Sequence, residues 1–487
     1  MAKKSKIIGR TDEQNLLNEA FISKRAEMIA IYGRRRVGKT YLIKNYFENM
    51  PCSLAYVSGM KDGRLSEQLE NFTSSIERDI AGVSLKRPLS WMEAFELFSQ
   101  VKDKIDKKKK VILFLDELPW LATKRSRLIQ ALDYYWNRFW SHDSRFKLVI
   151  CGSAVSWMIR NIIMNKGGLY NRVTRQICLE PFTLKETKDF LRFIGVNLNN
   201  RQIVELYMVA GGVPYYLNHV QKGLSAAQNI AKMAFSKQGI LYQDFNHLFA
   251  SLFEDAEKYH EIIRSIAEYR YGIEQEELIK KCSQLSHGGS ATRQLQDLEE
   301  AGFIVSFIPC DRKKKGIYFR VIDEYVSFYL KWIDPHKRSV AKLDKSKSIW
   351  LSHRETASWK SWSGYSFETI CLKHIAQIRE ALNIEPSALT TSWRHDGRLG
   401  DEGAQIDLLF DRQDDAVTIC EIKYTDKPFQ IDKSYYQQIM KKIEVYKKTV
   451  KTHKEIFLAF VTSSGLKKSL YSEEYISSVL TLEDLFK

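Results

Sequence analysis

The chain has 487 residues, of which 44% are hydrophobic and 28% are charged, so we expect about three folded domains without long disordered segments. Its net charge of +16 favours a polyanionic partner such as DNA, although an anionic membrane surface would attract the same charge. The seven cysteines form no CxxC pair, and no apolar run is long enough to span a membrane. These features argue against zinc and disulfide frameworks and predict a cytoplasmic protein outside the membrane.

The first strong motif follows the apolar segment EMIAIY, which predicts a short buried strand. GRRRVGKT then fills residues 33–40 and matches the phosphate-binding pattern GxxxxGK[ST], with an amphipathic helix beginning at about Lys39. Two glycines let the backbone turn its N–H groups toward the β- and γ-phosphates, Lys39 adds charge there, and the Thr40 hydroxyl would ligate Mg²⁺. The loop residues predicted to bind ATP are Gly33, Arg36, Val37, Gly38, Lys39 and Thr40.

Two further apolar strands supply the acidic and polar partners that such a loop requires. Residues 111–115 predict a strand buried on both faces that ends in Asp116-Glu117. Asp116 would hold Mg²⁺ through water, and Glu117 would polarise the attacking water. The next buried strand, FKLVICG, ends just before Ser153. The Ser153 hydroxyl could sense the γ-phosphate or could only cap the following helix.

These motifs, together with GGLYNRVT and AGGVPYYL further along, resemble the archaeal and bacterial P-loop ATPases of the AAA+/STAND group, over about residues 5–335. The resemblance implies an α/β core with a parallel sheet over residues 1–182 and a helical lid over residues 183–254. The three- and four-residue spacing of apolar residues in the second range also predicts helices.

The resemblance also implies roles that the residue types alone leave open. Ser153 would be the sensor residue, and Arg172 would be an arginine finger. By itself, an arginine in a glycine-rich loop is as readily a solvated side chain. The residues that would surround the adenine are Gly9, Arg10, Gly212 and Pro214.

Residues 255–335 predict a winged helix, with helices followed by two strands joined by a basic turn. Such a domain can place its second helix in the DNA major groove. The positions of that helix expected to be exposed are, however, largely acidic, which favours packing against the nucleotide core over DNA contact. These positions are Gln294, Gln296, Asp297, Glu299 and Glu300.

After a polar, basic linker over residues 336–350, a new α/β domain is predicted over residues 351–487. One strand carries Asp407, and the next carries Glu421 and Lys423 two positions apart, so both of the latter side chains point to one face. Two carboxylates beside a lysine can hold Mg²⁺ or Mn²⁺ and steady a hydroxide for attack on phosphorus. The pattern therefore predicts phosphodiester hydrolysis.

In the order helix, strand, strand, helix, this region resembles the PD-(D/E)XK restriction-endonuclease-like superfamily, and more narrowly the archaeal-type ATPases that carry such a C-terminal domain. The resemblance gives Glu368 the first-helix position, and it gives Gln437 or Gln438 the position on the following helix. The family's Pro-Asp is Ile406-Asp407 here, a departure that leaves the metal site intact. The same fold is often kept only as a binding module.

The sequence as a whole predicts an ATPase whose nucleotide state governs a metal-dependent, nuclease-like domain acting on DNA, in defence or repair. A regulatory STAND-type switch with an inactive nuclease fold is the alternative, and a toxin-like effector released by oligomerisation is a third. The expected partners are ATP, DNA and either further copies of the chain or another protein.

Overall fold

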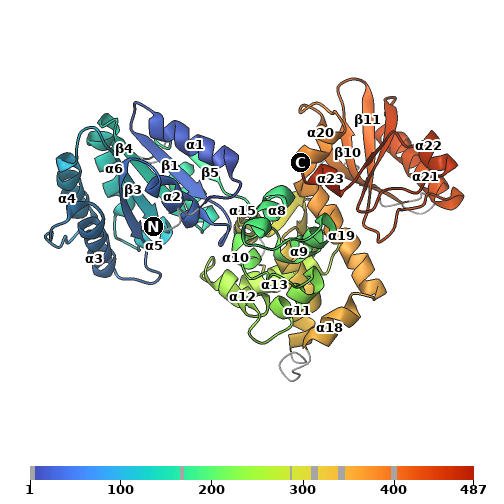
Figure 1. The fold of residues 1–487 in the computed structure, drawn as a ribbon, viewed down its shortest axis with the longest axis horizontal. Coiled ribbons are helices and arrows are strands. Elements are labelled where there is room, and N and C mark those ends of the chain that lie inside the picture. The colour runs from blue at the N-terminus through green and yellow to red at the C-terminus, as the bar shows by residue number, and fades with distance from the viewer. Residues whose placement is uncertain are drawn as a thin grey trace. The chain divides into compact units, whose positions relative to one another are not determined.

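A computed structural model gives the fold (Figure 1). The residues that it describes are 6–164, 169, 171–285, 288–308, 316–337, 346–395 and 403–487. The chain forms two compact units. The first unit comprises Met1–Pro181 with the short segments Leu252–Glu254 and Gln296–Ala301, and the second comprises the remainder, from Phe182 to Lys487.

The first unit is built on a five-stranded parallel sheet with the strand order β2-β3-β4-β1-β5. The apolar runs in β1, β3 and β4 are buried because helices cover both faces of the sheet. This arrangement confirms the predicted α/β core. The strands are β1 (Glu27–Tyr32), β2 (Cys52–Ser58), β3 (Lys110–Asp116), β4 (Phe146–Gly152) and β5 (Arg175–Cys178).

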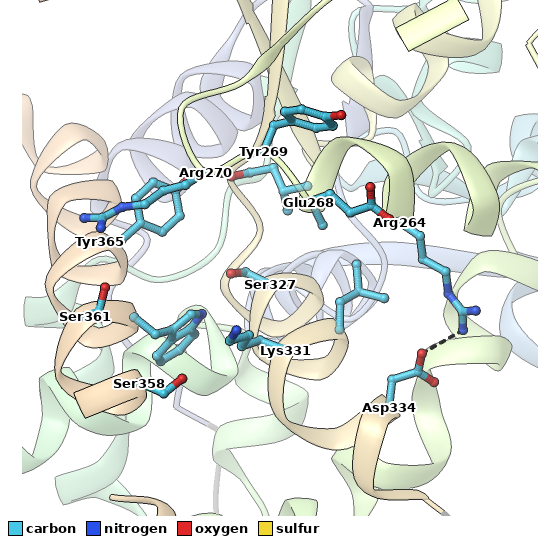
Figure 2. A pocket seen from close by; sticks show the side chains of 14 residues that line it. Arg264, Glu268, Tyr269, Arg270, Ser327, Lys331, Asp334, Ser358, Ser361 and Tyr365 are labelled. Atoms are coloured by element: carbon cyan, nitrogen blue, oxygen red, sulfur yellow. Dashed lines mark hydrogen bonds and ion pairs between the residues drawn. The ribbon is translucent and has the colours of Figure 1, made fainter. Parts of the chain in front are cut away.

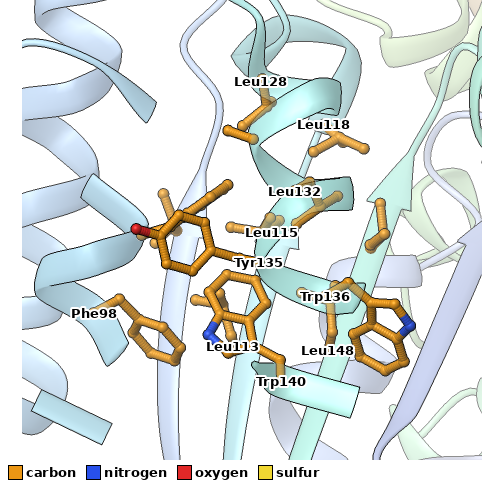
Figure 3. Close-up of a cluster of buried hydrophobic side chains, with 14 of the residues drawn as sticks. Phe98, Leu113, Leu115, Leu118, Leu128, Leu132, Tyr135, Trp136, Trp140 and Leu148 are labelled. Carbon is orange, nitrogen blue, oxygen red and sulfur yellow. The ribbon is translucent and has the colours of Figure 1, made fainter. Parts of the chain in front are cut away.

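Alternate residues of each strand point to opposite faces, so the unit has two separate apolar clusters. One contains Ile29 and Ile31 with helices α1 and α2, and the other contains Met28 and Ala30 with α3, α4 and α6. Figure 3 shows part of the second cluster, where aromatic side chains of the helical layer lie over leucines of the strands. The helices are α1 (Thr11–Ile22), α2 (Lys39–Glu48), α3 (Leu65–Ile76), α4 (Trp91–Lys104), α5 (Leu118–Leu121), α6 (Leu128–Arg138) and α7 (Val155–Met158).

The second unit begins with the helical segment that was predicted as a lid. Thr183 and Ser225 each form a capping box and Asn199 caps its helix with its side chain, which explains where three of these helices begin. Gly211, in a left-handed conformation, ends α9, and Pro214 begins α10. The helices are α8 (Leu184–Phe193), α9 (Asn200–Ala210), α10 (Pro214–Leu217), α11 (Ala226–Ala234) and α12 (Ile240–Ala250).

The next segment has the helix and strand order of a winged helix, with an antiparallel three-stranded sheet in the order β6-β8-β7. The predicted basic turn, residues 309–315, lies outside the described residues. The elements are α13 (Ala256–Ala267), β6 (Ile273–Glu274), α14 (Gln275–Lys281), α15 (Gly289–Glu300), β7 (Ile304–Phe307), β8 (Tyr318–Val321) and α16 (Glu324–Phe328).

The acidic face expected on α15 is less exposed than its sequence predicts. Of the five positions named above, only Gln296 is exposed, and Asp297 is buried. The Asp297 carboxylate accepts a 2.9 Å hydrogen bond from Arg160 Nη1, and both residues belong to the first unit. Asp297 is thus partly neutralised by an ion pair.

The C-terminal part of the second unit contains a mixed five-stranded sheet in the order β13-β12-β11-β10-β9. Strands β9, β10 and β11 are antiparallel neighbours, whereas β11, β12 and β13 are parallel. The strands are β9 (Leu389–His395), β10 (Ala404–Asp411), β11 (Ala416–Lys423), β12 (Glu455–Thr462) and β13 (Ser478–Leu480). The helices are α18 (Ser346–His353), α19 (Ala357–Lys373), α20 (Ile375–Ala381), α21 (Lys433–Val450), α22 (Leu470–Glu474) and α23 (Leu482–Leu485).

The last five residues of the expected linker, 346–350, belong to α18 and not to an extended connection. Trp350 is fully buried and stacks on Phe235, with ring centroids 5.3 Å apart. Burial of this large side chain anchors the helix by packing within the second unit. Among the described residues, no helix is both long and apolar enough to cross a membrane.

Candidate functional site

The phosphate-binding loop joins the end of β1 to the start of α2. Gly33 has a φ of 141°, and a Cβ at this position would lie 2.3 Å from the carbonyl oxygen of Leu179. Gly38 has a φ of 95° and directly precedes α2, so the loop backbone leads into a helix N-terminus. Arg36 also adopts a left-handed conformation, with a φ of 72°. A loop of this shape in front of a helix N-terminus is suited to bind phosphate.

The Lys39 side chain lies inside the curve of this loop. It is 5% exposed, and its Nζ donates hydrogen bonds to the carbonyl oxygens of Gly33 at 2.8 Å and Arg34 at 2.9 Å. Its ammonium is therefore positioned at the concave side of the loop, where phosphate would bind.

The oxygen atoms of Thr40 and Asp116 meet at the carboxyl edge of the sheet. Thr40 Oγ1 donates a 2.7 Å hydrogen bond to Asp116 Oδ2, which also accepts a 3.2 Å bond from the Tyr56 hydroxyl. The Asp116 carboxylate is 3% exposed. A hydroxyl and a carboxylate at this spacing are oxygen ligands of the kind that Mg²⁺ prefers, so these residues fit that metal. Tyr56, on the neighbouring β2, is a partner that sequence reasoning missed.

Glu117 and Ser153 lie at the ends of β3 and β4, which are adjacent in the sheet. The Ser153 hydroxyl donates a 2.6 Å hydrogen bond to Glu117 Oε1, and the Ser153 N–H donates a 3.1 Å bond to Oε2. Ala154, not Ser153, is the N-cap of α7, and it makes no side-chain cap. In this structure Ser153 therefore holds the Glu117 carboxylate and does not cap the helix.

Gly9 and Arg10 also lie against the loop. Arg10 is 5% exposed, and its Nη2 donates a 3.2 Å hydrogen bond to the carbonyl oxygen of Val37. The Gly9 carbonyl accepts a 2.8 Å bond from the Gln14 side chain. The segment is thus fixed beside the loop, and its contact with adenine stays a prediction.

The remaining predicted nucleotide residues are Arg172, Gly212 and Pro214. Arg172 is exposed and, in the described part of the chain, its side chain makes no hydrogen bond or ion pair. Gly212 and Pro214 belong to the second unit. A Cβ on Gly212 would lie 2.2 Å from the Phe182 carbonyl oxygen, so this glycine is required by a close backbone approach. The roles predicted for these residues stay predictions.

Comparison with known proteins agrees with the geometry of this loop. A family model described as an ATPase domain predominantly from Archaea matches residues 8–220. The chain therefore contains a P-loop ATPase domain. An uncharacterized protein of Methanocaldococcus jannaschii is 26% identical to it over 440 residues, which make up 89% of this chain and 91% of that protein.

Two more matches also concern ATP-binding proteins. An uncharacterized ATP-binding protein of Methanocaldococcus jannaschii is 45% identical over 50 residues, or 10% of this ATPase and 85% of that protein. Among solved structures, the Walker-type ATPase of Pyrococcus abyssi is 17% identical with a TM-score of 0.47, and the match covers 67% of this chain and 96% of that one.

The second unit of the ATPase brings Asp407 and Glu421 together on neighbouring antiparallel strands. Leu408 of β10 pairs with Cys420 of β11, and Asp407 Oδ2 accepts a 3.2 Å hydrogen bond from the N–H of Ile422. Burial and the nearby charge of Glu421 raise the pKa of Asp407 above its usual value. The two carboxylates are therefore close enough to repel each other.

Glu421 is surrounded by donors. Its Oε1 accepts a 2.7 Å hydrogen bond from Lys442, and its Oε2 accepts bonds from Tyr435 at 2.9 Å and Lys423 at 3.1 Å. Burial alone would raise the pKa of Glu421, but the ammonium groups of Lys423 and Lys442 outweigh burial and hold the pKa below its usual value. Burial would likewise lower the pKa of Lys423, but Glu421 keeps it raised.

Glu368 joins this group from α19. Its burial and the charge of Asp407 raise the pKa of Glu368 to about 7. Arg270 Nη2 lies 3.4 Å from Glu368 Oε1 and partly compensates the charge. The structure thus brings together all four residues that the sequence predicts for this site.

On α21, the position expected for Gln437 or Gln438 is taken by other residues. Both glutamines are exposed, and the α21 side chains that reach Glu421 are those of Tyr435 and Lys442. These two residues are seven positions apart and flank the buried Ile439, so helical periodicity places them on the inner face of α21. This spacing is the sequence signal that would have identified them.

A divalent cation at this site would depend on few protein ligands. Within the described ranges, no group of three or more His, Cys, Asp or Glu side chains is arranged to hold a metal ion. Mg²⁺ commonly binds through one or two carboxylates and completes its shell with water and substrate phosphate. Asp407 and Glu421 fit that mode of binding, with the substrate supplying further oxygen atoms.

Proposed function

We propose that this ATPase uses its nucleotide state to control a metal-dependent, phosphodiester-cleaving site on the C-terminal sheet, with DNA as the substrate. The observation that carries the proposal is the convergence of Glu368, Asp407, Glu421 and Lys423. These residues come from α19, β10 and β11, yet their charges interact, and Glu421 among them is fully buried while the other three are half-buried.

The electrostatics of the site favour a bound cation. Burial raises the pKa of both Glu368 and Asp407, and the charge of Asp407 adds to this at Glu368 as the charge of Glu421 does at Asp407. The ionised forms of Glu368 and Asp407 are therefore not fully compensated by the protein. A divalent cation between Asp407 and Glu421 would supply it. When bound, such a cation polarises the phosphoryl group and lowers the pKa of a coordinated water.

The protein side chains then have separable roles. Lys423, on the same strand face as Glu421, would steady the attacking hydroxide and the charge that develops on phosphorus. Tyr435 and Lys442 hold the two oxygens of Glu421 and so fix the direction of its carboxylate. The basic last turn of α21, with Lys447 and Lys448, offers positive charge for a nucleic-acid backbone.

In the nucleotide site we assign roles by the geometry around the loop. Lys39 would contact the β- and γ-phosphates, while Thr40 and Asp116 would hold Mg²⁺. Glu117, held by Ser153, would orient the attacking water. Arg172 is exposed and would act on ATP bound by a neighbouring copy, which implies a homo-oligomer. Gly9, Arg10, Gly212 and Pro214 would lie around the adenine.

Helix α9 offers a physical link between the predicted lid and the C-terminal site. Near its start, Arg201 Nη1 donates a 2.6 Å hydrogen bond to the carbonyl oxygen of Thr425, two residues after Lys423, and Nη2 pairs with Asp426. In the middle of α9, the buried Glu205 pairs with Arg354 at 2.7 Å. A displacement of α9 on nucleotide binding would therefore pull on the end of β11.

The long relative supports a functional connection between the two regions. Its alignment of 440 residues extends far beyond the 8–220 range of the ATPase domain, so the C-terminal region accompanies the ATPase domain in that protein as well.

A second candidate function is a regulatory switch whose C-terminal domain binds a partner without cleaving it. Both oxygens of Glu421 already accept hydrogen bonds from Lys442, Lys423 and Tyr435, and this favours a carboxylate that is neutralised by the protein itself. The two candidates make opposite predictions about catalysis.

The deciding experiment is a cleavage assay with purified protein, plasmid DNA and either Mg²⁺ or Mn²⁺. We expect nicking or cutting that is lost in Asp407→Asn and Lys423→Ala. Asp415→Asn, in the exposed turn between β10 and β11, and Lys427→Ala, also exposed, are matched controls and should cleave normally. Absence of metal-dependent cleavage by the wild type, with ATP hydrolysis intact, would support the binding-module candidate instead.

A further inference from the structure

A cavity of about 610 Å³ lies within the second unit (Figure 2). Most of its lining comes from the C-terminal end of α13 and the residues after it, from α16 and the residues after it, and from α19. This volume falls within the range of about 300–1,000 Å³ that is typical of small-molecule sites. Figure 2 shows Ser358, Ser361 and Tyr365 along one helix, with Arg264 and Asp334 on the opposite side. None of the lining residues belongs to the phosphate-binding loop or to the strands around it.

The basic side chains of the cavity are only partly neutralised. Arg264 forms a 3.0 Å ion pair with Asp334. Lys331, in contrast, is exposed and has no carboxylate partner in the described part of the chain. The Nε of Arg270 is buried without a hydrogen-bond partner. Among the described residues, the Arg270 guanidinium contacts one carboxylate, that of Glu368, with Nη2 3.4 Å from Oε1. Lys331 and Arg270 can therefore accept an anionic group from a ligand.

Neutral donors and aromatic rings complete the lining. The hydroxyls of Ser327, Ser358 and Ser361 make no hydrogen bond with any described residue. Trp362 is 8% exposed, and its buried indole N–H has no partner. The guanidinium carbon of Arg270 lies 5.2 Å from the centre of the Tyr365 ring. Buried donors without partners are costly, so the Trp362 indole N–H and the Arg270 Nε point to a ligand with acceptor atoms, and the more exposed serine hydroxyls offer further donors at the cavity.

We propose that this cavity is a second nucleotide site, separate from the P-loop, which takes a small phosphate-bearing nucleotide with its phosphate at Lys331 and Arg270. The serine hydroxyls would bind sugar or phosphate oxygens, and the aromatic side chains would provide a surface for the base. Anionic charge, several acceptor atoms and a planar ring occur together in nucleotides, whereas inorganic phosphate would leave the aromatic side of the cavity unused.

Arg270 connects this cavity with Glu368 of the proposed cleavage site. Because Arg270 also approaches Glu368, a bound phosphate would compete with Glu368 for the guanidinium. If the proposed cleavage site is correct, this ligand would change the charge balance around Glu368 and so adjust cleavage. The binding itself does not depend on the proposed cleavage activity, and a binding measurement tests it separately.

The test is isothermal titration calorimetry on the full-length Lys39→Ala protein, in which the P-loop is disabled. The probes are AMP, ADP and the dinucleotide pApA, with inorganic phosphate and a single-stranded oligonucleotide for comparison. We expect saturable binding of at least one of the three nucleotides. Adding Lys331→Ala should weaken it about tenfold or more, as for loss of a charge-assisted hydrogen bond.

Two further variants make the result specific. Ser361→Trp, on the exposed part of α19, should fill the cavity and abolish binding, whereas Lys360→Ala, an exposed neighbour that does not line the cavity, should leave it unchanged. The proposal is overturned if the Lys39→Ala protein binds none of the nucleotides or binds only the oligonucleotide. Unchanged affinity in both the Lys331→Ala and Ser361→Trp variants would overturn it equally.

Discussion

Ser153 donates two hydrogen bonds to the Glu117 carboxylate, one from its hydroxyl at 2.6 Å and one from its backbone N–H at 3.1 Å. The orientation of the proposed water-activating group is therefore set by the neighbouring strand. Ser153→Ala removes the hydroxyl bond, and a hydrogen bond to a charged group contributes about 1.5–3 kcal/mol. We expect kcat for ATP hydrolysis to fall about tenfold or more while KM changes little, and Ser153→Thr to restore much of the rate.

Steady-state hydrolysis measurements check this expectation. Ser156→Ala is the matched control, because Ser156 is also buried nearby but its side chain makes no hydrogen bond to Glu117. A Ser153→Ala protein that keeps the wild-type kcat would show that Ser153 does not position Glu117.

Lys39→Ala and Glu117→Gln should separate ATP binding from hydrolysis. Lys39→Ala removes the phosphate charge, so both ATP binding and hydrolysis should be lost. Glu117→Gln leaves the loop intact and should bind ATP without hydrolysing it. Nucleotide retained through gel filtration, identified by chromatography, measures the difference, with the exposed Lys24→Ala as a control. Retention of ADP by the Glu117→Gln protein would contradict the role assigned to Glu117.

Arg172 is expected to act across a boundary between copies of the chain because its side chain is exposed. Arg172→Ala and Glu117→Gln proteins should each be inactive alone and should recover part of the ATPase rate when mixed, since one interface of the mixed oligomer would hold both intact residues. Mixed rates equal to the sum of the separate samples, at concentrations where the wild type oligomerises, would instead favour a solvated arginine.

His374 should make the stability of the second unit depend on pH. Its Nε2 accepts a 3.0 Å hydrogen bond from the N–H of Leu184, its Nδ1 lies 2.8 Å from the Ile370 carbonyl oxygen, and burial lowers its pKa to about 4. The unfolded histidine has a pKa near 6.5. Between about pH 4 and pH 6.5 it therefore binds a proton that the folded histidine does not bind. The stability contributed by neutral His374 is thus present above pH 6.5 and lost as the pH falls toward 4.

His374→Gln should therefore reduce the pH dependence. Between pH 7 and 5 the wild type should lose about 2 kcal/mol of unfolding free energy that this variant does not lose. Urea unfolding of the second unit's transition at both pH values measures the loss, and His453→Gln, which changes an exposed histidine, is the control. An identical loss in wild type and His374→Gln would show that His374 is not the titrating group.

The sequence predicted those features that depend on local pattern. The strand, loop and helix around Lys39 follow from apolar runs and glycine spacing, and so does the placement of Glu421 and Lys423 on one strand. The contacts of Ser153 with Glu117 and of Tyr56 with Asp116 depend on which strands are neighbours, β3 with β4 and β2 with β3. Strand order is a property of the whole sheet, so these partners could not be inferred from any one segment.

The central claim is that ATP bound at the P-loop controls cleavage at Asp407, and the rate of DNA cleavage at different nucleotide states tests it most directly. Cleavage by the Glu117→Gln protein, measured with ATP, with ADP and without nucleotide, should differ several-fold between ATP and the other two conditions. Arg201→Ala, which removes the bonds to Thr425 and Asp426, should abolish that difference while ATP hydrolysis continues in an otherwise wild-type chain. Equal cleavage rates in all three nucleotide states, or cleavage that persists in Asp407→Asn, would contradict the claim.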